Sequence, residues 1–213
     1  MKFVNIPRPN ATNGVFHDSQ LTDHGEMLTK MFLGDFENCL ETNNFSSFKK
    51  TMVFVKNVKS AIAINNYLNT KYKHIPIHSR PWVLNHGRKQ EVSVHNIASR
   101  SDDDTIQLYL TTNTMLMGLN IPKVRIVVMI GPLTMMGDLL QAAGRAGRRE
   151  EGGRAKCVFY NCYSKTDLLH HVSPAVIEFC NLKTCLKKFC NEHFGWPSSP
   201  SGGEWCCSNC NGL

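Results

Sequence analysis

The segment from Gln141 to Arg148 holds the residues with the clearest chemical potential, in the order Gln-Ala-Ala-Gly-Arg-Ala-Gly-Arg. We expect Arg145 and Arg148 to lie on one helical face, because residues three apart are neighbours on a helix. Their guanidinium groups are always charged and can bind phosphate oxygens through paired hydrogen bonds. Gly144 and Gly147 let the backbone approach a neighbour closely. The pattern predicts a site that stabilises charge on a transferring phosphoryl group, against the alternative of an exposed basic helix start.

Cysteines form the second candidate site. The chain has nine of them, an odd number, and six crowd into its last part. In a reducing compartment such a cluster is more readily a metal site than a set of disulfides. The six are Cys180, Cys185, Cys190, Cys206, Cys207 and Cys210.

Length and charge restrict the function classes. A chain of 213 residues has room for one α/β domain and a small appended module. The formal net charge of +7 favours a polyanionic partner such as nucleic acid. No run of apolar residues approaches the roughly 20 that a membrane span needs, and no signal peptide is evident, so we expect a soluble intracellular protein without a membrane partner.

The elements that must position these residues alternate in type. Short apolar runs, typical of strands buried on both faces, are separated by helical patterns such as the one from Ala61 to Leu68, and this alternation predicts an α/β fold with a parallel sheet of five or six strands. An amphipathic stretch from Leu21 to Leu40 predicts a lead-in helix. The apolar runs are 52–55, 75–77, 105–110, 124–130 and 156–160.

The segment 141–148 resembles motif VI of superfamily-two helicases, Gln-x-x-Gly-Arg-x-Gly-Arg. The resemblance implies the second RecA-like lobe of a motor, a parallel sheet flanked by helices. It also implies that Arg148 is an arginine finger that reaches ATP held mainly by a first lobe, with Arg145 and Gln141 supporting the same nucleotide contact. Because motif VI is shared across the superfamily, an RNA helicase lobe stays an alternative.

The segment 110–125 is similar to motif V of the RecQ family of DNA helicases. The resemblance implies that Thr112, Gly118 and Asn120 contact nucleotide or DNA, whereas a segment of this kind on its own is more often an ordinary strand-loop-strand unit. Leu116 replaces a family glycine and Asn120 replaces the family aspartate, which puts coupling to ATP through this loop in doubt. The matching positions are Thr112, Met117, Gly118, Pro122, Val124 and Arg125.

Three weaker matches to the RecQ family occur in the family's order. Arg8-Pro9-Asn10 resembles the tripeptide that opens the second lobe, and Met52-Val53-Phe54-Val55 resembles motif IV. His78 stands where the family has a histidine after the next strand. Each match alone is weak evidence, and their order is what supports the resemblance.

The cysteine cluster resembles the RecQ zinc module. Cys185 is followed at the family spacing by Phe194-Gly195, and the later cysteines match the adjacent-cysteine form found in RecQ helicases of the Werner syndrome type. The resemblance implies a small, mostly helical module with structural zinc. With the commoner bacterial spacing, the last ligand position falls on Leu213, which has no thiol. Cys190 or Cys180 would then supply the missing thiolate. Lys183, Lys187 and Lys188 suit either phosphate contacts or a solvated basic face. The implied ligands are Cys185, Cys206, Cys207 and Cys210.

These patterns predict a lead-in segment at 1–48, a RecA-like lobe at 49–161 and the zinc module at 162–213. The resemblance implies half of a RecQ-like, 3′-to-5′ ATP-dependent DNA helicase of the nucleus, with a role in repair or recombination. The 213 residues contain no Gly-x-x-x-x-Gly-Lys-Ser/Thr loop. ATP and Mg²⁺ are therefore expected only with a first lobe in cis, and the isolated chain is expected to be inactive. The alternative is a non-catalytic module that binds DNA or protein.

Overall fold

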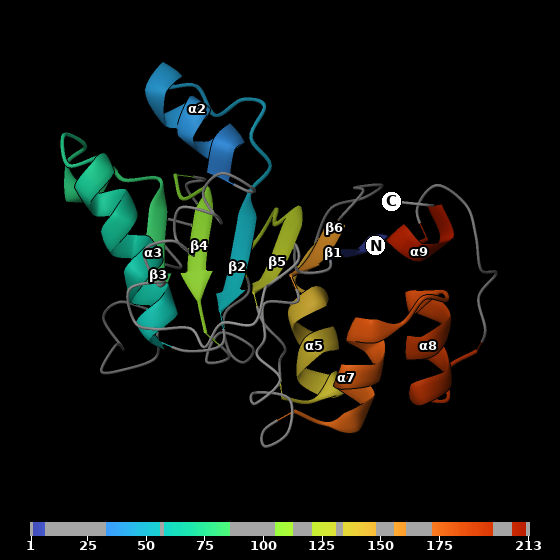
Figure 1. Ribbon diagram of the computed structural model, residues 1–213. Helices are drawn as coiled ribbons and strands as arrows, with labels where there is room; N and C mark the ends of the chain where they lie inside the picture. Colours follow the sequence, from blue (N-terminus) through green and yellow to red (C-terminus); the bar gives the residue numbers. More distant parts are fainter. Residues whose placement is uncertain are drawn as a thin grey trace. The chain divides into compact units, whose positions relative to one another are not determined.

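The computed structural model (Figure 1) describes residues 2–6, 33–55, 58–85, 105–112, 121–130, 134–147, 156–160, 172–197 and 206–211. The chain divides into two compact units. Unit 1 combines Met1–Ala11 with Lys123–Leu213, and unit 2 is Thr12–Pro122. Each unit contains parallel strands with helices beside them.

Unit 2 contains the first βαβ arrangement. Strands β2 (Thr51–Val55), β4 (Leu108–Thr111) and β3 (Trp82–Asn85) lie side by side in that order and run parallel. Every residue of β2 and β4 is buried, which explains why their sequences are continuous apolar runs without polar alternation. Helices α2 (Gly34–Thr42) and α3 (Val58–Lys71) belong to the same unit.

Aromatic rings fill the centre of unit 2. The fully buried ring of Phe36 lies 5.7 Å from that of Phe45, 5.2 Å from that of Phe48 and 6.3 Å from that of Trp82, measured between centroids. The tilted and edge-on geometries are those that aromatic pairs favour, because ring edges and faces carry opposite partial charges. Helix α2 is therefore attached to the strand layer through Phe36.

Unit 1 contains the remaining described strands, β1 (Lys2–Ile6), β6 (Lys156–Tyr160) and β5 (Ile126–Ile130), parallel and in that order. Figure 1 shows helices α5 (Met136–Ala143), α7 (Pro174–Asn181) and α8 (Leu186–His193) next to one another, with the short α9 (Ser208–Asn211) near β1. The rings of Phe179 and Phe189 join α7 to α8 at 6.1 Å.

The structure confirms the predicted fold class, a RecA-like parallel α/β sheet flanked by helices. Strands β2, β4, β5 and β6 occur where apolar runs predict them, although β4 begins at Leu108 and β5 at Ile126. The predicted strand at 75–77 is wrong: a turn leads into the 3₁₀ helix Ile77–Ser79, because Pro76 has no amide hydrogen to donate to a ladder. Of the predicted helix at 21–40, residues 21–32 lie outside the described part.

Among the described helices, none has both the length and the apolar composition needed to cross a bilayer.

Candidate functional site

Helix α5 positions the arginine-glycine segment. Its buried face, which includes Leu139 and Ala142, packs into unit 1, and the helix ends at Ala143. Beyond it the backbone turns: the amide of Arg145 donates to the carbonyl of Ala142 at 3.0 Å. The expectation that Arg145 and Arg148 extend one helical face is wrong at this point, because the helix stops before Arg145 and Gly147 adopts a left-handed φ of 76°.

The two glycines of this segment have distinct roles. A Cβ on Gly144 would lie 3.2 Å from the carbonyl oxygen of Leu140, so the turn after α5 leaves little space for a side chain. Gly147 has a positive φ, and its amide donates to the carbonyl of Val124 at 2.8 Å. Glycine avoids the strain that other residues meet in this conformation. The segment is thereby held against the chain that leads into β5.

The predicted nucleotide and DNA contacts are described only in part. Gln141 is exposed on α5, whereas Arg145 is only 6% exposed, so the two side chains differ in their access to a ligand. Thr112 lies in unit 2, directly after the carboxyl end of β4, and is 6% exposed. Arg148, Gly118 and Asn120 lie outside the described residues, as does Leu116.

The structure brings four thiols together in unit 1. The Sγ atoms of Cys185, Cys206, Cys207 and Cys210 all lie within 4.8 Å of one another. The separations are 3.4 Å for Cys185–Cys206, 4.0 Å for Cys185–Cys207 and 3.5 Å for Cys207–Cys210. Four sulfurs bound to zinc at about 2.3 Å in a tetrahedron are about 3.8 Å apart. The donor set and its spacing therefore fit a tetrahedral metal ion with four thiolate ligands.

Backbone and amide contacts hold the two halves of this four-cysteine cluster together. Cys185 caps helix α8, and its Sγ accepts a hydrogen bond from the amide of Lys188 at 3.4 Å. Asn209 donates through its Nδ2 to the carbonyls of Leu182 and Thr184, both at 2.7 Å. Asn209 thus fixes the α9 segment against the segment before α8 that carries Cys185. Sequence reasoning missed Asn209; its place in Cys-Ser-Asn-Cys was the only available signal.

The other cysteines of this region are core residues. Cys180 and Cys190, the alternative ligands, are buried in α7 and α8 and do not belong to the cluster that the described residues form. Burial raises the pKa of each thiol to about 12, so both stay neutral. The pKa of Cys210 is also raised above the ordinary thiol value, chiefly by its hydrogen bond with Cys207, since the thiols stabilise one another in protonated form.

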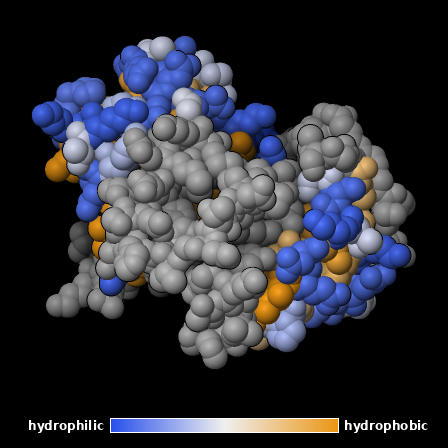
Figure 2. Space-filling view, in the orientation of Figure 1, coloured by the Kyte–Doolittle hydropathy of each residue, from blue (hydrophilic) through white to orange (hydrophobic). Residues whose placement is uncertain are grey.

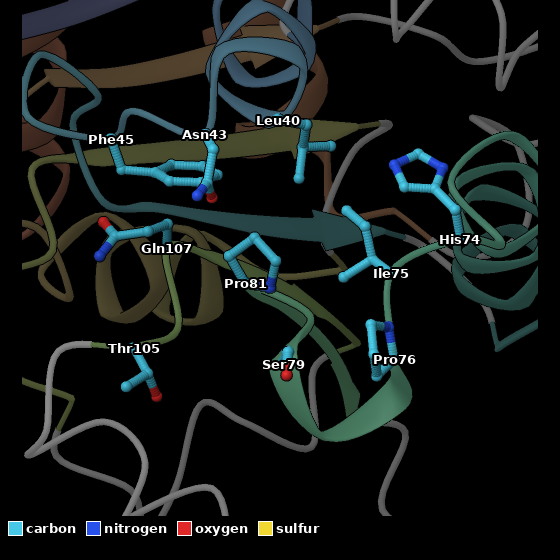
Figure 3. A pocket seen from close by; sticks show the side chains of 10 residues that line it. All are labelled: Leu40, Asn43, Phe45, His74, Ile75, Pro76, Ser79, Pro81, Thr105 and Gln107. Atoms are coloured by element: carbon cyan, nitrogen blue, oxygen red, sulfur yellow. The ribbon is translucent and has the colours of Figure 1, made fainter.

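A pocket of about 630 Å³ lies in unit 2 (Figure 3). Residues before the strands line it: Pro81 precedes β3, and Thr105 and Gln107 precede β4. It therefore lies toward the amino ends of these strands, whereas Thr112 follows the carboxyl end of β4. Ligands of open α/β sheets usually bind at the carboxyl ends. None of the predicted site residues lines this pocket.

The chain belongs to the helicase conserved C-terminal domain family, whose model matches residues 33–150. This span includes the described motif residues of both units, from Thr112 to Gly147. The assignment of the chain to a helicase second lobe is confirmed at this level. No curated protein matches the sequence.

Solved structures share the fold at low identity. The C-terminal domain of the DEAD-box protein Dbp5 is 14% identical with a TM-score of 0.52, and the match covers 91% of this chain and 84% of that one. The Mycobacterium smegmatis helicase Lhr, bound to ssDNA and AMP-PNP, is 15% identical with a TM-score of 0.57 over 84% of this chain. The helicase MrfA, bound to DNA and AMPPNP, is 18% identical with a TM-score of 0.54 over the same share. The chain spans 21% of the Lhr and of the MrfA chains.

Proposed function

We propose that this chain is the second RecA-like lobe and zinc module of a RecQ-like, 3′-to-5′ ATP-dependent DNA helicase that acts in the nucleus. The lobe would occupy 49–161 after a lead-in segment at 1–48, and the module 162–213. The observation that carries the RecQ-like assignment is the four-cysteine cluster, which lies in the same chain as a helicase C-terminal domain.

In this proposal a first lobe in cis holds ATP and Mg²⁺, and the present chain supplies the charge that completes the site. The guanidinium of Arg148 donates hydrogen bonds to the transferring phosphoryl group, and such an arginine commonly accelerates the step by about 10³ to 10⁵. Gln141 and Arg145 support the same contact, and the turn through Gly144 and Gly147 sets its direction.

DNA would lie against the carboxyl ends of the strands, where Thr112 and the loop with Gly118 and Asn120 meet its phosphates. Cycles of ATP binding and hydrolysis would open and close the two lobes and move the strand. Zinc, bound by the four cysteines, would supply folding energy to the module and take no part in the reaction.

The experiment combines the purified chain with a separately produced first lobe of a RecQ helicase and follows DNA-stimulated ATP hydrolysis. We expect hydrolysis only when both parts are present, and a loss of at least about 100-fold in Arg148→Ala. Arg149→Ala is the matched control, because it removes the same charge one position later and should retain activity. Zinc is quantified in the same preparations, with about one ion per chain expected.

A second candidate is a non-catalytic module that binds DNA or protein. The residues that favour it are Leu116 and Asn120, which depart from the RecQ motif in the loop that couples DNA to nucleotide. Association of the two lobes with zinc present and DNA bound, but without ATP turnover, would support this candidate over the motor.

A further inference from the structure

An aromatic stack runs from the end of α8 to the exposed ring of Trp196. The rings of Phe194 and Trp196 lie nearly parallel, with centroids 4.9 Å apart and planes inclined by 22°. His193 meets Phe194 edge-on at 4.8 Å, and Phe189 lies parallel to His193 at 6.2 Å. Trp196, the last ring of this series, is 52% exposed. A large exposed indole is more informative than an exposed aliphatic residue, because such rings are usually mostly buried.

The backbone holds Trp196 in place. Gly195 reverses the chain after α8 with a φ of 65°. The amide of Trp196 donates to the carbonyl of Asn191 at 2.8 Å, and the side-chain amide of Asn191 donates to the carbonyl of Pro197 at 3.2 Å. The ring therefore projects from a fixed turn, and a ligand that stacks on it loses little additional conformational entropy.

Lysines accompany the stack on α8 and the chain before it. Lys187 lies one helical turn before Asn191, on the side of the helix that anchors Pro197. Lys188 is 3.7 Å from Glu192, but both side chains are more than 60% exposed, so this pair is weak and Lys188 can exchange its partner for a phosphate. Lys183 is also exposed. Figure 2 shows hydrophilic and hydrophobic patches side by side on the coloured surface of unit 1.

We propose that Trp196, backed by Phe194, stacks on a base of single-stranded nucleic acid while Lys187 and Lys188 contact the phosphates beside it. Parallel aromatic rings bordered by positive charge are the combination that binds single strands without regard to sequence, since every base has a π face and every phosphate a negative charge. Along its length a duplex presents only base edges, so the ring would find a base face only at a duplex end. The choice of nucleic acid as ligand rests on the function proposed above.

The test measures binding of fluorescent 12-nucleotide oligothymidylate, oligouridylate and a blunt duplex of equal length to the full zinc-loaded chain, by anisotropy and without ATP. Trp196→Ala should weaken binding of the single strand by about 5- to 100-fold, the range for one lost base stack. Trp196→Phe should retain most of the affinity, and the duplex should bind both variants as it binds the parent. The thymidylate and uridylate arms distinguish DNA from RNA.

Ile77→Ala is the matched control, because Ile77 is a large exposed apolar side chain of unit 2, 76% exposed. It should leave single-strand binding unchanged. A second readout does not depend on the alanine variant folding: oligothymidylate should quench tryptophan fluorescence of the parent chain, and most of that quenching should disappear in Trp196→Phe.

Unchanged single-strand affinity in Trp196→Ala, with normal zinc content, would overturn the proposal, as would an equal loss of duplex binding. Because ATP is absent, this result is independent of the Arg148 test. If the chain stacks bases at Trp196 but supports no hydrolysis with a first lobe, the base-stacking proposal stands and the motor assignment fails.

Discussion

The aromatic core of unit 2 and the four-cysteine cluster of unit 1 are organised by different physical interactions. The buried rings of Phe36 and Trp82 and the half-buried rings of Phe45 and Phe48 contact one another directly and need no ligand to complete their packing. The segments around Cys185 and Cys207 instead meet through thiols whose separations fit a metal ion. The comparison teaches that one chain can hold one region by apolar burial and bring together in another a set of thiols suited to a metal ion, so the two regions should respond to different perturbations.

Loss of the proposed zinc ion should give the largest effect. Cys207→Ser, or a strong chelator, should abolish zinc binding and unfold the module, because zinc binding contributes about 10–16 kcal/mol to the folding of small zinc peptides. Metal content and limited proteolysis after residue 172 measure the result. Cys190→Ala is the control that should retain zinc, and zinc loss in that variant would assign the ligands differently.

Truncation of a ring in the aromatic core should destabilise unit 2 and leave the four-cysteine cluster intact. Phe36→Ala should lower the free energy of unfolding of unit 2 by about 3–5 kcal/mol, since a fully buried ring leaves a cavity. Denaturant unfolding provides the measurement. Zinc content should stay at the parent level; coupled loss of metal would show that the two regions do not respond separately.

A matched pair of glycine substitutions should have smaller effects of opposite sign. Gly147→Ala places a side chain at a φ of 76° and should destabilise the protein by about 1–2 kcal/mol. Gly137→Ala lies in α5 with no atom within 4 Å of the added Cβ, and it should stabilise the helix by up to about 1 kcal/mol. Thermal unfolding distinguishes them, and equal shifts in one direction would contradict the assigned conformations.

The smallest expected effect concerns Glu37, which accepts hydrogen bonds from Lys71 at 2.6 Å and from Tyr67 at 3.4 Å. The bond to Glu37 raises the pKa of Lys71 above its ordinary value of 10.5. A raised lysine pKa stabilises the fold below that value, and the contribution disappears as pH rises through the folded-state pKa. Burial raises the pKa of Tyr72 to about 12, which adds to the alkaline loss.

Glu37→Gln should therefore cost about 0.5 kcal/mol at neutral pH, because Lys71 is 41% exposed and solvent screens the pair. The difference between variant and parent should shrink above pH 10.5 in denaturant titrations. A difference that grows with pH would contradict the assigned pairing.

Sequence patterns predicted the α/β class and strands β2, β4, β5 and β6, since continuous apolar runs are typical of strands buried on both faces. Strands β1 and β3 were missed because Lys2–Ile6 and Trp82–Asn85 include polar residues within or beside their apolar ones. Pairing with β6 and β4 makes them strands, and such distant partners leave no local signal.

The candidate sites also contain some residues that the sequence predicted and others that it could not. Spacing and motif resemblance indicated the four cysteines and the arginine-glycine segment, because those residue types carry the chemistry themselves. Asn209 and the Phe194–Trp196 stack could not be predicted, since their roles depend on contacts formed only after α8 and α9 fold. The turn after α5 likewise includes a contact with a distant part of the chain, the bond from the Gly147 amide to the Val124 carbonyl.

The discontinuity of unit 1 has a consequence for synthesis on the ribosome. Unit 2 is a single stretch of sequence, and its strands can pair as soon as they emerge. Strand β1 is made before the whole of unit 2, yet Lys2 pairs with Lys156, so β1 waits for its partner until unit 2 has been translated. During that interval β1 lacks its partner strand, and nascent-chain lengths that stop before β6 should be the most prone to aggregate.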